Sequence, residues 1–282
     1  MELCYLEYVG IPMMKWGKEA SNREPVRDMR PQNALAEAAT PKTKPLYMEG
    51  TYILQCKARV KHVERCEGSL AVELDQTVFH PQGGGQPSDT GLLIAEGLPT
   101  LKVIFVSKKD GTIRHDCEAS SDCQKKWVDM TQRGSQRDSL EVLCQVDEEK
   151  RRLCARLHSA GHLLDVAVFS LGFRWQAGKG YHFQEGPYVE YIPTENGRQV
   201  DPKDAKAKAS AIEEISEKMK ELIAKKVPTE VGFVDGMRTI TMDGVSCGCG
   251  GTHVEFSSEI GEVLIKKIQA KQGNIRVSYA VS

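Results

Sequence analysis

The pattern of apolar and polar positions changes near residue 147 and divides the chain into two parts with different secondary structure. Between residues 47 and 146, alternating or β-rich runs predict strands at 51–60, 70–79, 101–107, 112–116 and 140–146. The dipeptide Asp110-Gly111, between two of these strands, is a strong signal for a hairpin turn. Several short strands at this spacing predict a small β-barrel or sandwich.

From residue 147 the apolar residues recur at the spacing of a helix. Asp147 is a suitable N-cap for a first helix, and Gly172 is a suitable end. The apolar residues of this helix are Leu153, Leu157, Leu164 and Val168. Short strands are predicted at 181–183 and 188–192, and a C-terminal hairpin at 262–270 and 275–281 turns at Gln272-Gly273-Asn274.

A second helix is predicted to begin at Asp201 as N-cap and to end at Pro228. Pro202 suits its first turn, and Asp204 adds a favourable negative charge there. Its apolar stripe is formed by Ala205, Ala209, Ile212, Ile215, Met219 and Leu222. The part beyond residue 147 is therefore predicted to be α+β, with helices packed on a largely antiparallel sheet.

Residues 1–45 show no sustained period, and the stretch 36–45 (AEAATPKTKP) has the composition of a linker. We therefore predict an irregular N-terminal arm over 1–46, a β-barrel domain over 47–146 and a second domain over 147–282. A length of 282 residues, with 40% hydrophobic and 27% charged residues, fits two modest globular domains.

Composition also limits the setting in which the protein works. The sequence contains no apolar run of transmembrane length and no signal peptide, so we expect a cytoplasmic protein without membrane contact. Nine cysteines, an odd number scattered along the chain, argue against a disulfide framework. The net charge of -1 gives no global attraction for nucleic acid, so an RNA partner would need local basic patches.

Two separate motifs indicate a metal site. His158 and His162 are four residues apart in the first helix, so both imidazoles lie on one helical face. The second motif is the glycine-rich segment 247–253 (CGCGGTH), in which Cys249 and His253 can complete a tetrahedral site. Thiolate together with imidazole favours zinc. Spacing alone does not choose between Cys247 and Cys249 as the sulfur ligand.

These motifs, His158-Ser159-Ala160-Gly161-His162-Leu163-Leu164 and Cys249-Gly250-Gly251-Thr252-His253, resemble those of the alanyl-tRNA synthetase editing domain and the free-standing AlaX editing proteins. The segment 79–91 (FHPQGGGQPSDTG) resembles the glycine-rich motif of the longer AlaX form. The resemblance covers about residues 47–282. It implies an N-terminal β-barrel followed by an α+β editing domain of the type shared with threonyl-tRNA synthetase.

The resemblance further implies zinc held by His158, His162, Cys249 and His253, because the family's Cys-x-x-x-His spacing falls on Cys249. It implies a hydrolase that removes serine or glycine from tRNA for alanine, acting in trans. Four protein ligands would close the zinc shell, so we expect an organising role; direct catalysis would require a ligand to leave or the shell to expand.

The resemblance also suggests the residues around the substrate. We expect Gly83, Gly84, Gly85, Gln86 and Thr90 to contact it, although the glycine run could be a bare structural turn. Lys179, His182 and Thr252 are the candidate catalytic residues. At 178–181 (GKGY), Gly178 and Tyr181 depart from the Gln-Lys-Gly-Ser-like segment of the synthetase editing domains.

Two other interpretations remain open. The protein could edit another aminoacyl-tRNA, or it could be a non-catalytic tRNA-binding module that keeps zinc for structure. Basic clusters that could contact tRNA phosphates are present at 57–65, at 203–208 and at 266–276. The sequence does not determine the oligomeric state, for which we expect a monomer.

Overall fold

The computed structural model describes residues 42–133, 140–201 and 203–282. The predicted irregular arm, residues 1–46, falls almost wholly outside this range. The described residues all belong to one compact unit, Thr40–Ser282.

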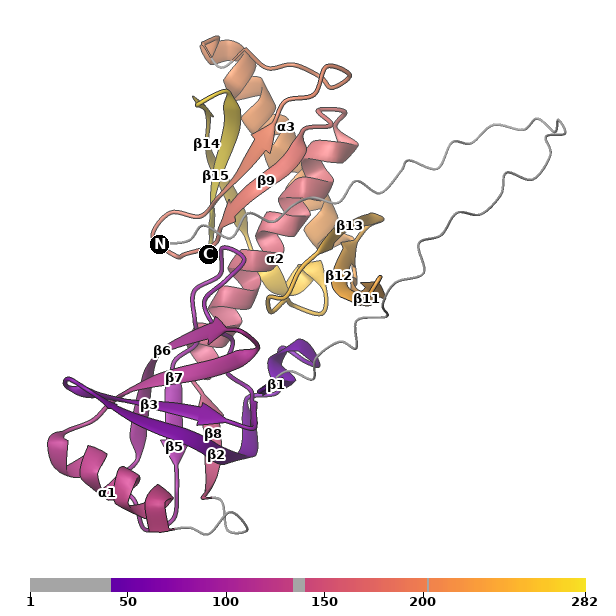
Figure 1. The fold of residues 1–282 in the computed structure, drawn as a ribbon. Helices are drawn as coiled ribbons and strands as arrows, with labels where there is room; N and C mark the ends of the chain where they lie inside the picture. The colour runs from indigo at the N-terminus through magenta and orange to yellow at the C-terminus, as the bar shows by residue number, and fades with distance from the viewer. Residues whose placement is uncertain (1–41, 134–139, 202) are drawn as a thin grey trace, which may run out of the picture. The chain divides into compact units, whose positions relative to one another are not determined.

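The strands predicted for the first part, together with one at 91–94 that was not predicted, form a closed barrel (Figure 1). The strands follow one another around the barrel in the order β2-β3-β7-β6-β5-β8. They are β2 (Gln55–Cys66), β3 (Ser69–Leu74), β5 (Gly91–Ile94), β6 (Leu101–Lys109), β7 (Thr112–Glu118) and β8 (Glu141–Val146). Closure confirms the predicted small barrel in preference to a sandwich. Asp110 and Gly111 both have positive φ, as a tight turn between β6 and β7 requires.

Short elements complete the first part of the chain. Strand β1 (Lys44–Pro45) pairs in parallel with β4 (Gln76–Thr77), and a 3-10 turn, η1 (Leu46–Met48), follows β1. Helix α1 (Ser121–Arg133) was not predicted, because its sequence is mostly polar. Trp127 is its fully buried anchor, and the indole Nε1 donates to the Pro99 carbonyl at 2.9 Å.

Helix α2 (Glu148–Ser170) confirms the first predicted helix. The Asp147 side chain accepts a hydrogen bond from the Lys150 backbone N–H at 3.1 Å, so Asp147 is the N-cap as expected. At the other end, Gly172 has φ of 81° and ends the helical path.

The second predicted helix begins later than expected. Helix α3 (Ala205–Ala224) is capped by Asp204, whose carboxylate accepts from the backbone N–H groups of Lys206 and Ala207. The prediction that Asp201 is the N-cap was therefore wrong; Asp201 instead accepts from the Lys203 N–H in the turn before the helix. The buried stripe consists of Ala211, Ile215, Met219 and Leu222, so the predicted Ala205 and Ala209 are exposed.

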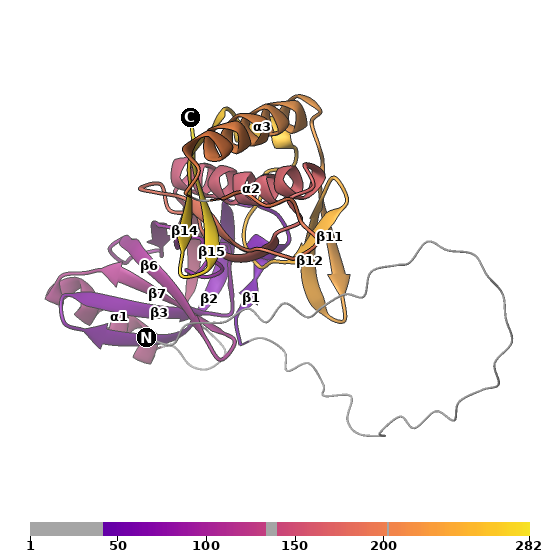
Figure 2. The same ribbon diagram turned by 90° about the horizontal axis from the view of Figure 1, so that it is seen from above.

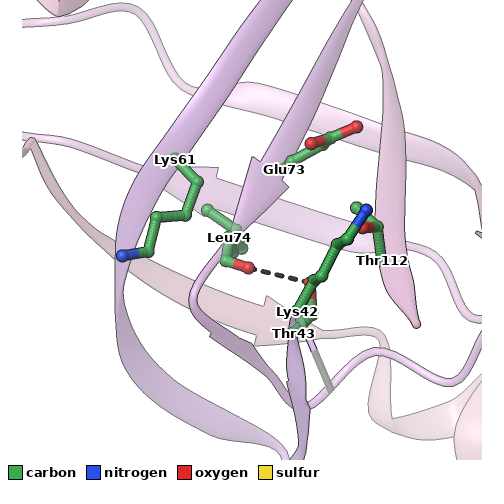
Figure 3. A pocket seen from close by; sticks show the side chains of 6 residues that line it. All are labelled: Lys42, Thr43, Lys61, Glu73, Leu74 and Thr112. Carbon is green, nitrogen blue, oxygen red and sulfur yellow. Dashed lines mark hydrogen bonds between the residues drawn. The ribbon is translucent and has the colours of Figure 1, made fainter. Parts of the chain in front are cut away.

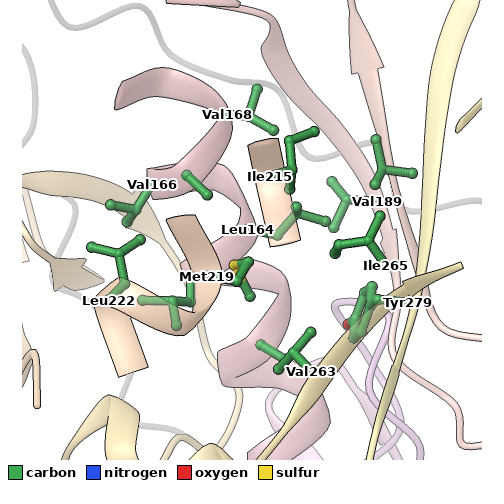
Figure 4. Packing of buried hydrophobic residues seen from close by; sticks show 14 of the residues in the cluster. Leu164, Val166, Val168, Val189, Ile215, Met219, Leu222, Val263, Ile265 and Tyr279 are labelled. Carbon is green, nitrogen blue, oxygen red and sulfur yellow. The ribbon is translucent and has the colours of Figure 1, made fainter. Parts of the chain in front are cut away.

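These two helices cover one face of a four-stranded antiparallel sheet (Figure 2). The sheet has the order β14-β15-β10-β9 and consists of β9 (Gln176–Tyr181), β10 (Tyr188–Ile192), β14 (Val263–Lys271) and β15 (Asn274–Val281). Side chains such as Val189, Ile265 and Tyr279 extend from the sheet to meet Leu164 and Ile215 of the helices (Figure 4). This confirms the predicted α+β architecture.

A small sheet of three strands leads into the metal-binding motif and was not predicted. Its strands are β11 (Thr229–Val234), β12 (Met237–Met242) and β13 (Val245–Gly248), and the 3-10 turn η2 (Ser257–Ile260) follows the motif. In the part of the chain that the structure describes, no helix is long and apolar enough to cross a membrane.

Candidate metal centre

Four side chains from two distant segments meet in one cluster. His158 and His162 lie one turn apart on α2, with ring centroids 4.9 Å apart. Cys249 and His253 come from the loop after β13, and the Cys249 Sγ lies 3.5 Å from the Nε2 atoms of both His158 and His253. The candidate ligand atoms of all four residues lie within 4.8 Å of one another, as one metal ion requires.

The loop reaches the helix closely because it carries glycine at the point of contact. A Cβ added to Gly251 would lie 2.2 Å from Cε1 of His158, which no side chain could tolerate. The loop is held by Arg238 on β12, whose Nη1 donates to the carbonyls of Cys249 at 2.7 Å and Gly251 at 3.2 Å. Nothing in the sequence pattern distinguished Arg238, because an arginine within a strand ordinarily faces solvent.

The protonation of the cluster suits a metal ion. Burial, reinforced by the neighbouring imidazoles, holds the pKa of His158 and of His253 well below the usual range, and burial lowers the pKa of His162 to about 4. The rings are therefore neutral and offer lone pairs. The Nε2 of His162 is buried and has no hydrogen-bond partner among the described residues, so a metal would satisfy it.

The fourth ligand is a sulfur. Burial raises the pKa of the Cys249 thiol, and a bound cation would reverse this by favouring the thiolate. Cys247, the alternative raised by the sequence, lies outside the cluster: its Sγ is 3.3 Å from Nδ1 of His162, on the other side of the ring from Nε2. One thiolate with three imidazoles is a donor set that zinc accepts readily.

Gln86 connects the barrel to the cluster. Its Oε1 lies 2.7 Å from Nδ1 of His158 and 3.0 Å from the backbone N of Thr252. Its Nε2 donates to the Thr252 hydroxyl at 2.9 Å. Since an amide oxygen only accepts, the His158 proton must be on Nδ1, which leaves Nε2 free to face Cys249 and a metal.

Gln86 occupies this position because a tight turn precedes it. Gly83 and Gln86 exchange backbone hydrogen bonds at 2.9 and 3.1 Å across Gly84 and Gly85, whose φ angles are 56° and 79°. Positive φ at both central positions is the type I′ geometry, which glycine adopts without strain. The Gly85 carbonyl accepts from the His182 backbone N–H at 2.9 Å, so the turn lies against the strand that leads to His182.

A buried ion pair fixes the same loop to α2. The Arg151 guanidinium bonds the Asp89 carboxylate, with Nε 3.1 Å from both oxygens, and both side chains are fully buried. Arg151 also donates to the carbonyls of Thr51 and Val78, and Asp89 accepts from the His80 N–H. Each of the three guanidinium nitrogens is thus hydrogen-bonded, so the pair joins the helix to the barrel loop.

His182 is next to the cluster. Its ring stacks on His158 with centroids 4.6 Å apart, and its Nδ1 is 2.7 Å from the Tyr279 hydroxyl. Tyr279 donates its one proton to the Leu157 carbonyl at 2.8 Å, so His182 must donate from Nδ1. The Nε2 of His182 therefore carries a lone pair, and burial lowers the pKa of this ring to about 3.

The other predicted site residues differ in their distance from the cluster. Thr252 is fully buried beside Gln86, whereas the Lys179 side chain is exposed and makes no hydrogen bond or ion pair with the described residues. Thr90 is half-buried, and its carbonyl accepts from the Asp147 N–H at 2.8 Å. Asp165 lies 3.9 Å from Nδ1 of His162, which is too long for a hydrogen bond, and it accepts from the Tyr191 hydroxyl instead.

A pocket of about 300 Å³ on the barrel is separate from this cluster (Figure 3). It is lined by Lys42, Thr43, Lys61, Glu73, Leu74 and Thr112, of which Lys61 belongs to the basic cluster 57–65 and the others to no predicted site. The Thr43 hydroxyl in it already donates to the Leu74 carbonyl at 2.9 Å. The pocket holds no constellation of catalytic or metal-binding groups.

Comparison with known proteins finds similarity to alanyl-tRNA editing proteins and to alanine–tRNA ligases. The chain is 27% identical to the alanyl-tRNA editing protein AlaX-M of Saccharolobus solfataricus over 85% of its own length and 99% of that protein. For AlaX-M of Methanosarcina barkeri the identity is 29%, over 82% of this chain and 97% of that protein. The alanine–tRNA ligase of Halobacterium salinarum is 29% identical over 86% of this chain, which spans only 26% of the ligase. No protein-family model matches the chain.

Proposed function

We propose, from the premise that this chain is a homologue of the AlaX-type alanyl-tRNA editing proteins, that it is a trans-editing hydrolase acting on mischarged tRNA for alanine. The observation that carries the proposal is the cluster of His158, His162, Cys249 and His253 with Gln86 bonded to it. The AlaX-M relatives, matched over nearly their whole length, support the same activity.

The need for such an enzyme follows from the limits of recognition. A pocket built for alanine cannot exclude glycine, which is smaller, and it discriminates weakly against serine, which adds one hydroxyl. A difference of this size is worth about 1–3 kcal/mol, so a second hydrolytic site is the general solution. Serine and glycine esterified to tRNA for alanine are therefore the proposed substrates.

We assign zinc to the cluster, held by His158, His162, Cys249 and His253. When bound, zinc would hold the loop and helix together and could supply Lewis acidity toward the ester carbonyl. Four protein donors would complete a tetrahedral zinc shell, which supports the organising role.

The reaction itself is hydrolysis of an ester. Water adds to the carbonyl carbon, the bond from that carbon to the ribose oxygen breaks, and the ribose oxygen takes up a proton. The lone pair on Nε2 of His182 can accept a hydrogen bond from water or from the substrate ammonium group. Thr252 can donate its hydroxyl proton, because that hydroxyl already accepts from Gln86.

The remaining parts of the proposal concern setting and specificity. The turn formed by Gly83, Gly84 and Gly85 and the half-buried Thr90 are proposed to line the amino-acid pocket, with Lys179 at its exposed rim. We further propose a barrel domain over 47–146 and an editing domain over 147–282, in a cytoplasmic monomer whose partner is tRNA.

The test is deacylation of Ser-tRNA, Gly-tRNA and Ala-tRNA, all on tRNA for alanine, with metal content measured on the same preparation. Release of serine or glycine with alanine spared is the expected result. Absence of hydrolysis by folded, zinc-loaded protein would refute the proposal and favour a binding module or another charged tRNA.

A further inference from the structure

The four-stranded sheet has one face that the helices do not cover. Val189, Val277 and Ile268 are buried against the helices, whereas their neighbours along each strand face away. Leu264, on this second face, is 60% exposed, and Tyr188 and Ser278 on the same face are half-buried. We call it the open sheet face.

Aromatic side chains form a stacked column along the open sheet face. The Tyr181 ring lies between two others, 4.5 Å from Phe183 at 12° and 5.3 Å from Tyr188 at 16°. The Arg276 guanidinium covers the far side of Tyr188 at 3.8 Å from the ring centroid. The column therefore runs Phe183, Tyr181, Tyr188, Arg276.

This column is not explained by core packing. Tyr181, Tyr188 and Phe183 are half-buried, and none of them belongs to either hydrophobic core in the described part of the chain. Tyr181 is also one of the positions at which the sequence departs from the synthetase editing domains. Planar groups stacked at a surface offer a platform for further planar groups, and nucleic-acid bases suit it best.

The charge along the same strands is complementary to phosphate. The acidic residue of these four strands, Glu190, is already paired with Arg276, with Oε1 2.5 Å from Nη2. The exposed lysines of β9 and β14 are Lys179, Lys266, Lys267 and Lys271, and none has an ion-pair partner among the residues that the structure describes. Lys267 lies in the same cross-strand row as Tyr188 and Tyr181, joined through Ser278.

The column is adjacent to the metal cluster along the chain. Phe183 and Tyr181 flank His182 in the sequence, and His182 is the residue whose ring stacks on His158. An RNA base stacked on Phe183 would therefore contact the residue next in sequence to His182, the candidate catalytic group.

We propose that the open sheet face binds the single-stranded 3′ end of an RNA, with a base stacked on Phe183 at the end of the column and the backbone phosphates along Lys266 and Lys267. This inference rests on the proposed function for the identity of the RNA. It assigns to Tyr181 and Tyr188 the role of holding Phe183 and Arg276 in place.

The experiment measures binding of RNA that carries no amino acid, so the result does not depend on hydrolysis. The full chain is titrated into a fluorescent single-stranded RNA ending in CCA and, separately, into a blunt RNA duplex of matched length. We expect preference for the single strand. Phe183→Leu should weaken that binding about tenfold, because stacking on an aromatic ring is worth about 1–3 kcal/mol per base.

Matched variants control for folding and for general effects. Phe233→Leu changes the phenylalanine on β11, which is 73% exposed and lies on a different sheet, so it should bind as wild type. Tyr188→Phe keeps the ring and should also bind as wild type. Metal content and unfolding temperature are compared for every variant.

Lysine variants test the phosphate contacts. Lys266→Gln with Lys267→Gln should lower the slope of log affinity against log salt by about 1.4, at about 0.7 per phosphate contact on single strands. The same double change at Lys125 and Lys126, which are exposed neighbours on α1 outside every predicted basic cluster, should leave the slope unchanged.

Failure of this inference is distinguishable from failure of the proposed function. Equal binding by wild type and Phe183→Leu would overturn the proposal that the open sheet face binds RNA, even if mischarged tRNA is hydrolysed. Equal affinity for the single strand and the duplex would overturn it as well. Loss of binding in Phe233→Leu instead places the RNA on β11 and overturns it too. Phe183-dependent RNA binding without hydrolysis upholds the surface and refutes only the editing activity.

Discussion

The Oε1 of Gln86 lies 2.7 Å from Nδ1 of His158, although the two residues belong to a barrel loop and to a helix of the second part of the chain. The contact selects one tautomer of a candidate metal ligand. The barrel therefore contributes to the candidate metal centre without supplying a candidate ligand.

Replacing Gln86 tests this contribution. In Gln86→Met the Nδ1–H of His158 and the Thr252 N–H lose their acceptor, and we expect zinc affinity to fall about 10- to 100-fold. Competition with a chromogenic chelator measures it. Gln82→Met is the matched control, since Gln82 is exposed and bonds only through its backbone N–H. Equal zinc affinity in both variants would contradict the role given to Gln86.

The glycine turn makes a prediction about two adjacent residues. Gly85→Ala should destabilise the protein more than Gly84→Ala. Both have positive φ, which costs alanine about 1–2 kcal/mol. Only at Gly85 would the new Cβ also meet an atom, 2.4 Å from the Gly180 carbonyl oxygen, whereas Gly84 faces open space. Urea unfolding of both variants checks the order; equal losses would show that the strand carrying Gly180 moves freely.

The buried ion pair predicts a non-additive pair of substitutions. Arg151→Met leaves the Asp89 carboxylate buried without a counter-charge, which should lower the free energy of unfolding by about 3–5 kcal/mol. Adding Asp89→Asn to this variant should recover part of the loss, because the uncompensated charge is gone. A double variant less stable than Arg151→Met alone would contradict the account.

Removal of a metal ligand separates the two roles considered for zinc. If zinc only organises the pocket, His253→Ala should lose stability and deacylation together. If zinc acts in the chemistry, a well-folded His253→Ala protein should still lose deacylation. Thermal unfolding and initial rates, each with and without chelator, distinguish these results. An active, stable, zinc-free variant would exclude both.

His115 predicts a pH dependence of stability within the barrel. It is fully buried, donating from Nδ1 to the Val72 carbonyl and bonding Thr77 through Nε2, and burial lowers its pKa to about 4. In the unfolded chain the His115 side chain has an ordinary pKa near 6.5, so it binds a proton more readily than in the folded protein. The contribution of His115 to the free energy of unfolding is therefore fully present above pH 6.5. It declines as the pH falls toward 4, by up to about 1.4 kcal/mol per pH unit.

The measurement is urea unfolding at several pH values for wild type and His115→Gln. The variant should be less stable at pH 7 and should show a shallower decline between pH 6.5 and 4. Parallel curves would mean that His115 titrates alike in the folded and unfolded chains.

The elements predicted correctly are those with strong local signals. Helix α2 has both a helical period and an N-cap at Asp147, and the turn at Asp110-Gly111 uses residues that tolerate positive φ. The order of the strands around the barrel depends on pairing between distant segments and is not encoded locally. Helix α1 was missed because one buried tryptophan, Trp127, anchors an otherwise polar sequence.

For the site, residue types and spacing identified the four members of the metal cluster, and the resemblance selected Cys249. The residues that support the cluster were harder to recognise. Arg151 within a helix and Arg238 within a strand look like solvated charges, and only the folded chain shows their carbonyl and carboxylate partners. Gln86 was predicted to contact substrate, and in the structure its amide bonds His158 and Thr252.

Helix α2 connects these supports over a short distance. Arg151 and His158 are about 10 Å apart along the helix axis, at 1.5 Å per residue. Coupling free energies are reciprocal, so if Gln86 strengthens metal binding through His158, the bound metal must stabilise the loop of Gln86 by the same amount. Amide hydrogens of that barrel loop should then exchange more slowly with solvent when the metal is bound, although the loop never touches it.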